Sequence, residues 1–506
     1  MYKRKQVGGI QEVFIEPKSM TVRSAEKIIN LIEKIGGHVR HVFQPAGLLA
    51  MVPAGKVAGL KGKAGIQTVH TGEISMKTRS ARVHAKHLAY TAWNDHIGGS
   101  RRVRALESRD LGKSWGASGK KPLHPPKNIE QHFRRLEATM MPKVRTARGA
   151  RGARGARGAP NFNIPVLVGR VGVGVVFVDS TVAKYKITNQ EKSKIVSELT
   201  EGLNMLAGFE PRAKIQWFYD FKRPSISLAA NKFTAANKNS WENLWRDEAM
   251  KKMGYTANTA GMNKYIADVK KKTKAQWAYA LYVTKYDKTW FAYYWGNHVV
   301  MDFAVDGWGI NNFSRVVAHE TGHVFGCPDE YSNAGCNCTS LHGRYQIKNG
   351  NCKTCASPFV PCLMEANTEA VCDYTRGHLG WNELAVQSKG TTTLKGTWTF
   401  DFDSGVQGPS GGADIWWEQV NNTIRLLVPQ SGAMLKHMGK PNFDAVSYQT
   451  LTAQAYTTTP INGSNNSANK LKPGSVIAIK TSAGRYAKMK INSYGYNLGI
   501  TWVTYK

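Results

Sequence analysis

The sequence predicts a multidomain α+β protein whose central part is an α/β domain with a mixed sheet. Its 506 residues are 42% hydrophobic, which is enough for several cores, since a typical domain has roughly 100–200 residues. Strand-like and helix-like apolar runs alternate after residue 164, and short β-type runs follow from about residue 390. We place the segments at 1–75, 76–163, 164–388 and 389–506.

An N-terminal α+β unit is predicted from the apolar spacing of residues 10–72. A helix around 25–32 ends at Gly36-Gly37, and the expected strands and short helix lie at 13–15, 38–43, 47–52, 57–60 and 66–69. This β-α-β-β-α-β order is the ferredoxin-like arrangement. With the run His38 to Phe43 in place, the unit resembles the propeptides of subtilisin-type proteases. The resemblance implies a unit that covers an active-site cleft and is then removed. An unrelated ferredoxin-like module is the alternative.

A basic linker is predicted at 76–163. Residues 81–160 contain 18 Lys and Arg against 5 Asp and Glu, and four Arg-Gly-Ala repeats begin at Arg148, Arg151, Arg154 and Arg157. This composition favours a flexible tether open to proteolysis, as the activation of a zymogen requires. The net charge of +34 also fits an anionic polymer or a cell surface as a partner. Specific nucleic-acid binding is not predicted, because no reader motif accompanies the charge.

Residues 164–388 predict alternating strands and helices, the pattern of a mixed α/β sheet. The expected strands are 166–178, 215–219, 277–283, 291–295 and 298–305, and the expected helices start near 190, 241, 262 and 312. The last helix carries His319 and His323. Residues four apart share one helix face, so the two imidazoles can bind one ion, and Glu320 beside them can act as a general base.

The residues after this helix extend the motif. Gly326 allows a sharp turn, and Asp329 can then return as a third ligand. The run His319 to Asp329 resembles the metzincin zinc peptidases, with aspartate as third ligand as in snapalysin-type enzymes. The resemblance implies Zn²⁺ on His319, His323 and Asp329, Glu320 as catalytic base, and protein or peptide substrates. Glu330 is the alternative third ligand.

Two further features are assigned through the same resemblance. Met364, in the run Pro361-Cys362-Leu363-Met364, is the candidate for the structural methionine turn beneath the metal. An ordinary core methionine is the alternative. Residues 278–283 and 291–296 fit the antiparallel edge strand that pairs with extended substrate.

Seven cysteines lie between residues 327 and 372, and none lies elsewhere. This confinement predicts local disulfides and an oxidising, extracellular compartment. The disulfide candidates are Cys336, Cys338, Cys352, Cys355, Cys362 and Cys372. A structural zinc site on the first four is the alternative. The basic N-terminus is followed by no apolar segment, so no signal peptide is predicted, and no 20-residue apolar run predicts a membrane span.

The C-terminal residues 389–506 predict an all-β module, in which Trp416-Trp417 is either core or a platform for sugar rings. Together the segments predict a zinc-dependent endopeptidase made as a zymogen. The alternative is a non-catalytic protein stabilised by zinc that binds anionic surfaces in a structural or adhesive role.

Overall fold

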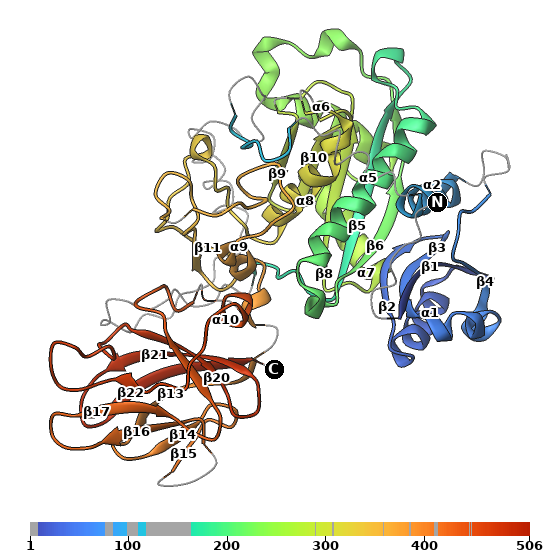
Figure 1. Cartoon of the computed structure of the whole chain (residues 1–506). Coiled ribbons are helices and arrows are strands. Elements are labelled where there is room, and N and C mark those ends of the chain that lie inside the picture. The colour runs from blue at the N-terminus through green and yellow to red at the C-terminus, as the bar shows by residue number, and fades with distance from the viewer. Residues whose placement is uncertain are drawn as a thin grey trace. The chain divides into compact units, whose positions relative to one another are not determined.

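The computed structural model describes residues 9–75, 84–98, 110–117 and 163–505, apart from 289, 306–307, 358, 384–385, 409–412, 445 and 447. The Arg-Gly-Ala repeats lie outside the described residues. The chain divides into a first unit, Met1–Arg344 with Asn349–Cys372, and a second unit, Tyr345–Lys348 with Asp373–Lys506. Its large mixed sheet and separate antiparallel sheets confirm the prediction of a multidomain α+β protein (Figure 1).

Ten strands form one sheet in the described part of the first unit. Nine of them follow the order β4 (Ile66–His70), β1 (Ile10–Pro17), β3 (Gly47–Pro53), β2 (His38–Phe43), β6 (Gln216–Lys222), β5 (Arg170–Ser180), β8 (Trp277–Thr284), β10 (His298–Asp302) and β9 (Ala292–Trp295). The tenth, β7 (Ser225–Ile226), pairs with β5, and the short β11 (Leu341–His342) lies apart from this sheet.

The part of this sheet from β6 to β9 contains both parallel and antiparallel strands. Strands β6, β5, β8 and β10 run parallel, whereas β9 runs antiparallel to β10 and ends the sheet. The predicted strands at 277–283, 291–295 and 298–305 are confirmed as β8, β9 and β10. The central strand β5 is buried along nearly its whole length, as expected for a parallel strand covered on both faces.

Four helices of the first unit accompany these strands: α5 (Asn189–Gly208), α6 (Trp241–Lys252), α7 (Thr259–Thr273) and α8 (Phe313–Val324). Helix α5 begins at Thr188, whose side chain forms a capping box with Glu191. Helices α5 and α8 cross closely at Gly202, where a Cβ atom would lie 2.0 Å from the carbonyl oxygen of Ser314. This close crossing holds α8, the helix that carries both histidines, firmly against α5.

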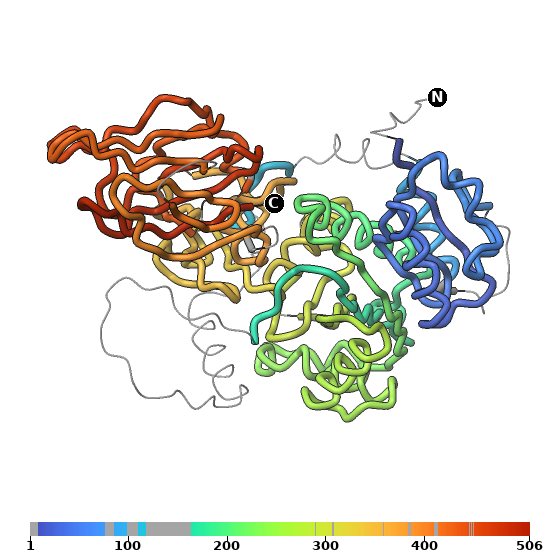
Figure 2. Tube along the Cα trace, turned by 90° about the horizontal axis from the view of Figure 1, so that it is seen from below, coloured from blue at the N-terminus to red at the C-terminus, as the bar shows by residue number. Residues whose placement is uncertain are grey.

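The N-terminal strands continue the sheet beyond β6. Strand β2 pairs in parallel with β6, so strands β1 to β4 extend the same sheet at the edge opposite β9. Helix α1 (Val22–Lys34) packs against these strands, in the part of the chain coloured blue in Figure 2. At the junction the buried His41 forms hydrogen bonds with Tyr219 and Asn204, at 2.8 and 2.9 Å. Burial lowers the pKa of His41 to about 3, so this imidazole is neutral at the junction. The short helix expected at 57–60 is replaced by 3₁₀ turns at 54–56 and 58–60.

Part of the segment that the sequence assigned to a linker is folded. Helix α2 (His84–Ile97) buries Leu88, Ala89 and Trp93, and the indole of Trp93 donates to the carbonyl of Gly72. Its His96 lies 3.1 Å from Glu12 of β1 and 3.6 Å from Glu201 of α5. Burial alone would lower the pKa of His96, but the bonds to the two carboxylates raise it to about 9.

Replacing His96 with glutamine is therefore expected to destabilise the protein in a pH-dependent way. A pKa raised on folding adds stability below the ordinary value near 6.5, and this stability is lost as the pH rises through about 9. The difference in unfolding free energy between wild type and His96→Gln should be roughly 3 kcal/mol larger at pH 6 than at pH 10. Urea unfolding at both pH values measures it. An equal difference at both would contradict the ion pairs.

The second unit contains two five-stranded antiparallel sheets. One has the order β13 (Val386–Leu394), β22 (Leu498–Tyr505), β21 (Tyr486–Ser493), β20 (Val476–Lys480) and β18 (Met434–His437). The other has the order β15 (Val406–Gly408), β14 (Thr399–Asp401), β16 (Ile415–Gln419), β17 (Arg425–Pro429) and β19 (Ile461–Asn462). The described residues of the unit also form strand β12 (Ile347–Lys348), the helices α9 (Asp373–His378) and α10 (Tyr448–Thr452), and a 3₁₀ turn at Trp381–Glu383.

The two sheets of this unit share one core cluster, which includes Phe400, Leu435 and Trp502. Of the tryptophan pair in β16, Trp417 lies fully inside this core, whereas Trp416 is half-buried and donates to the carbonyl of Thr397. Trp417 is therefore a core residue, and the two rings do not form one flat platform on which sugar rings could stack.

Candidate metal centre

Helix α8 presents His319 and His323 within a fully buried element. The hydroxyl of Thr321 contacts Tyr279 of β8 at 3.0 Å, which fixes the rotation of the helix against the sheet. Gly322 lies on the side of Met364, because a Cβ at that position would lie 2.9 Å from the methionine sulfur. The helix is thus held so that both imidazoles face the loop that follows it.

Three ligand atoms converge beside this helix. The Nε2 atoms of His319 and His323 lie 3.0 Å apart, and Oδ1 of Asp329 lies 3.2 and 3.3 Å from them. Two ligands at 2.0–2.2 Å from a tetrahedral zinc ion are about 3.3–3.6 Å apart. The three atoms therefore have nearly the spacing that one such ion requires.

The remaining ring nitrogens are fixed by backbone carbonyls. Nδ1 of His319 bonds the carbonyl oxygen of Leu363 at 2.9 Å, and Nδ1 of His323 bonds that of Cys327 at 2.7 Å. A carbonyl accepts only from an N–H, so each Nδ1 carries the hydrogen and each Nε2 is available as a donor to a metal. Burial lowers the pKa of His319, which favours its neutral, metal-binding form. Burial alone would also lower the pKa of His323, but Asp329 and Glu320 raise it to about 9, so a metal ion must displace a proton from this imidazole.

Asp329 is delivered by the turn that ends α8. Gly326 has a φ of +87°, and a Cβ there would lie 2.8 Å from Gly343, so glycine is required on both counts. The backbone then leads Asp329 back to the histidines. Its neighbour Glu330 points elsewhere: its carboxylate accepts from Asn351 at 2.7 Å and from the Cys372 thiol at 3.0 Å.

Glu320 follows the first histidine in α8 and has no exposed surface. Burial raises the pKa of Glu320 to about 8, an effect that the nearby His323 opposes and Asp329 reinforces. A carboxyl group with such a pKa is suited to accept and return a proton near neutral pH.

Met364 and the edge strand both lie close to these residues. Met364 is buried, and its carbonyl oxygen accepts from the amide of Glu330 at 3.0 Å, while the preceding carbonyl of Leu363 is the one that orients His319. On the other side, the ring of Tyr294 in β9 stacks 6.2 Å from that of His323. The structure thus brings the predicted methionine and the antiparallel edge strand to the histidines.

No protein-family model, curated protein or solved structure matches this chain. Among the described residues, further groups of possible ligands are Asp401 with Asp403 and Asp414, Glu330 with Cys362 and Cys372, and Cys338 with Cys352 and Cys355. Only the group in α8 combines two oriented imidazoles with an adjacent buried glutamate. Among the described helices, none has the length and apolar character needed to cross a membrane.

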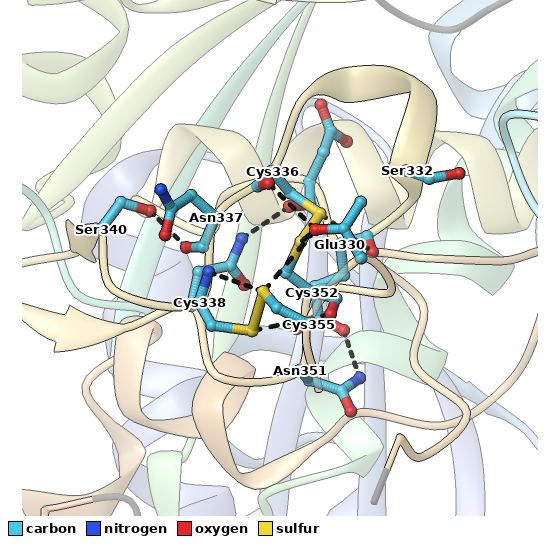
Figure 3. Close-up of a disulfide and its surroundings, with 12 residues drawn as sticks. Glu330, Ser332, Cys336, Asn337, Cys338, Ser340, Asn351, Cys352 and Cys355 are labelled. Carbon is cyan, nitrogen blue, oxygen red and sulfur yellow. Dashed lines mark hydrogen bonds between the residues drawn. A yellow bond between two sulfur atoms is a disulfide. The ribbon is translucent and has the colours of Figure 1, made fainter. Parts of the chain in front are cut away.

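The cysteine-rich loop contains two disulfides, Cys336–Cys352 and Cys338–Cys355 (Figure 3). All four sulfurs are paired in this structure, which favours the predicted disulfides over the alternative of a zinc site on these cysteines. The disulfides indicate an oxidising compartment. Cys362 and Cys372, also named as disulfide candidates, remain thiols together with Cys327. All three thiols are buried, and that of Cys372 donates to Glu330.

One residue beside the centre has no signal in the sequence. Residues 110–117, from the segment predicted as linker and visible as the short cyan piece in Figure 1, place Trp115 against His319, with ring centroids 5.5 Å apart. Trp115 is fully buried. Neither periodicity nor a motif surrounds it, so only the three-dimensional structure reveals this contact.

Proposed function

We propose that the first unit is a zinc-dependent endopeptidase of the metzincin type. The observation that carries this proposal is the convergence of His319, His323 and Asp329 at 3.0–3.3 Å, next to the buried Glu320. The donor set suits zinc, since two imidazoles and one carboxylate are common zinc ligands. Asp329 is the third ligand in this proposal, because Glu330 is engaged with Asn351 and Cys372.

Several residues have separate roles in the proposed hydrolysis of the peptide bond. When bound, zinc polarises a carbonyl and lowers the pKa of a water ligand. Glu320 takes the proton from the attacking water and later passes it to the leaving amine. The edge strand β9, antiparallel to β10, pairs with the extended substrate by its main chain. Leu363 and Cys327 hold the two imidazoles in their donor orientation through their carbonyl oxygens.

The remaining segments complete this proposal. The N-terminal unit has the strand order β4-β1-β3-β2, which is compatible with a ferredoxin-like fold. The enzyme is made as a zymogen, acts outside the cell, and uses its basic segment and the second unit to bind an anionic polymer or a cell surface. The disulfides support the extracellular location, and the net charge of +34 supports the anionic partner.

Removal and return of zinc tests the proposed activity. We expect the full chain, when loaded with zinc, to cleave an unstructured protein substrate slowly when intact and faster after limited trypsin treatment. A chelator should abolish cleavage and added zinc should restore it, with mass spectrometry of the substrate as the readout. One bound zinc per chain with no turnover in either state would instead support the structural alternative, as would loss of the fold on chelation.

A further inference from the structure

Residues 110–117 pair with the chain just after Met364. The amide of Gly112 donates to the carbonyl of Asn367 at 2.7 Å, and the amide of Asn367 donates to that of Lys113 at 2.9 Å. The amide of Trp115 donates to Glu365 at 2.9 Å. Ser114 forms an antiparallel bridge with Ala366. The segment is thus bound like an added strand, by main-chain hydrogen bonds.

The indole of Trp115 is buried beside His319, one of the proposed metal ligands. Its Nε1–H donates to the carbonyl of Leu363 at 2.7 Å, the same carbonyl that orients His319. Its ring meets those of His319 and Trp308 edge-on, at centroid distances of 5.5 and 4.8 Å. A fully buried indole with its N–H satisfied is a strong anchor for a bound peptide.

The rest of the segment adds little apolar burial. Leu111 is 52% exposed, and Trp115 is the one buried apolar side chain between residues 110 and 117. At its other end, the segment crosses the loop after Asp329, where the side-chain amide of Asn333 donates from Nδ2 to the carbonyl of Gly116 at 2.7 Å. One inserted aromatic side chain with main-chain pairing along one edge is how an extended peptide binds.

We propose that residues 110–117 occupy the substrate cleft, and that the pocket filled by Trp115 is the subsite for a large aromatic side chain of the substrate. This inference rests on the proposed peptidase function. It names the class of substrate, which is peptides with a large aromatic side chain, and the segment that inhibits the enzyme. Because the segment is tethered, its effective concentration at the cleft is in the millimolar range, well above that of most substrates. The intact chain is therefore inhibited by its own segment, and the N-terminal strands, at the edge opposite β9, are not the inhibitor.

The full-length variant Trp115→Ala tests whether residues 110–117 inhibit the enzyme. With zinc present, it should cleave an unstructured protein at least about tenfold faster than intact wild type, because the anchor that keeps the segment in place is lost. Leu111→Ala, in the same segment but exposed, is the matched control and should cleave at the wild-type rate. An unchanged or lower rate for a folded Trp115→Ala chain would show that the segment is a permanent part of the fold and would overturn the proposal.

A milder variant covers the case in which Trp115→Ala does not fold. Trp115→Phe keeps an aromatic ring in the pocket but loses the hydrogen bond to Leu363. Since such a bond contributes about 1 kcal/mol, the rate should rise about fivefold. Wild-type activity in a folded Trp115→Phe chain would overturn the proposal.

Peptide binding separates this inference from the proposed function. A fluorescent peptide with the sequence of residues 110–117 should bind the full-length Trp115→Ala, Glu320→Gln chain, measured by anisotropy, and the same peptide with alanine for tryptophan should bind at least about tenfold more weakly. Binding without turnover in the Trp115→Ala chain would uphold the subsite and reject the peptidase. Turnover without preference for the tryptophan peptide would reject the subsite and uphold the peptidase.

Discussion

The variant Glu320→Gln is expected to cleave peptide bonds about 10³-fold more slowly than the wild type, because a positioned general base contributes roughly 10²–10⁴ to the rate. Glutamine has the same shape as glutamate but cannot accept the proton. Glu320 is fully buried in α8 and is not one of the three converging ligand atoms. The zinc content of the variant should therefore equal that of the wild type.

The comparison needs chains in which the cleft is open, so Glu320→Gln is best measured in the Trp115→Ala background. Cleavage of an unstructured protein gives the rate, and elemental analysis of the purified chain gives the zinc content. Full activity with zinc retained would reject Glu320 as the base. Loss of both activity and zinc would show that Glu320 supports the metal centre rather than the proton transfer.

The variant Asp329→Asn is expected to bind zinc at least about 100-fold more weakly than the wild type. The amide has no negative charge, and loss of a ligand should exceed the 10–100-fold effects of outer partners. Oδ1 of Asp329 lies within 3.3 Å of both histidine Nε2 atoms. Competition with a chromophoric zinc chelator measures the affinity directly.

Glu330→Gln is the matched control, since it makes the same chemical change at the adjacent carboxylate. Glu330 contacts Asn351 and Cys372 instead of the histidines, so this variant should keep its zinc affinity within a fewfold of the wild type. The opposite outcome, with weak binding only in Glu330→Gln, would show that Glu330 is the third ligand.

The residues of the centre could be predicted because their relation is local. His319 and His323 are one helical turn apart, and the three-residue steps to Gly326 and Asp329 fix where the chain turns and returns. The same holds for β8, β9 and β10, whose apolar runs are long enough to mark strands. Spacing favours Asp329 over Glu330 as the third ligand but leaves Glu330 as an alternative. The structure separates them, because the two carboxylates point to different partners.

Contacts between distant segments could not be predicted from the sequence. Trp115 meets Leu363 across 248 positions, and no local pattern records such a pair. Helix α2 lies in a basic stretch whose composition hides the burial of Leu88 and Trp93. The disulfide pairing was equally open, since six cysteines allow 15 complete pairings. The parallel pairing of β2 with β6 joins two segments that each read as a separate domain.

That shared sheet has a consequence for any processing of the chain between residues 118 and 162. Glu26 on the N-terminal side forms an ion pair with Arg170, and His41 is buried against Asn204 and Tyr219 on the far side of the cut. A cut would break the polypeptide but none of these contacts. The two fragments would stay together as one particle, in the manner of a split protein whose halves complement each other. The N-terminal fragment would then be retained as a permanent subunit, and activation would depend on residues 110–117 leaving the cleft rather than on loss of that fragment.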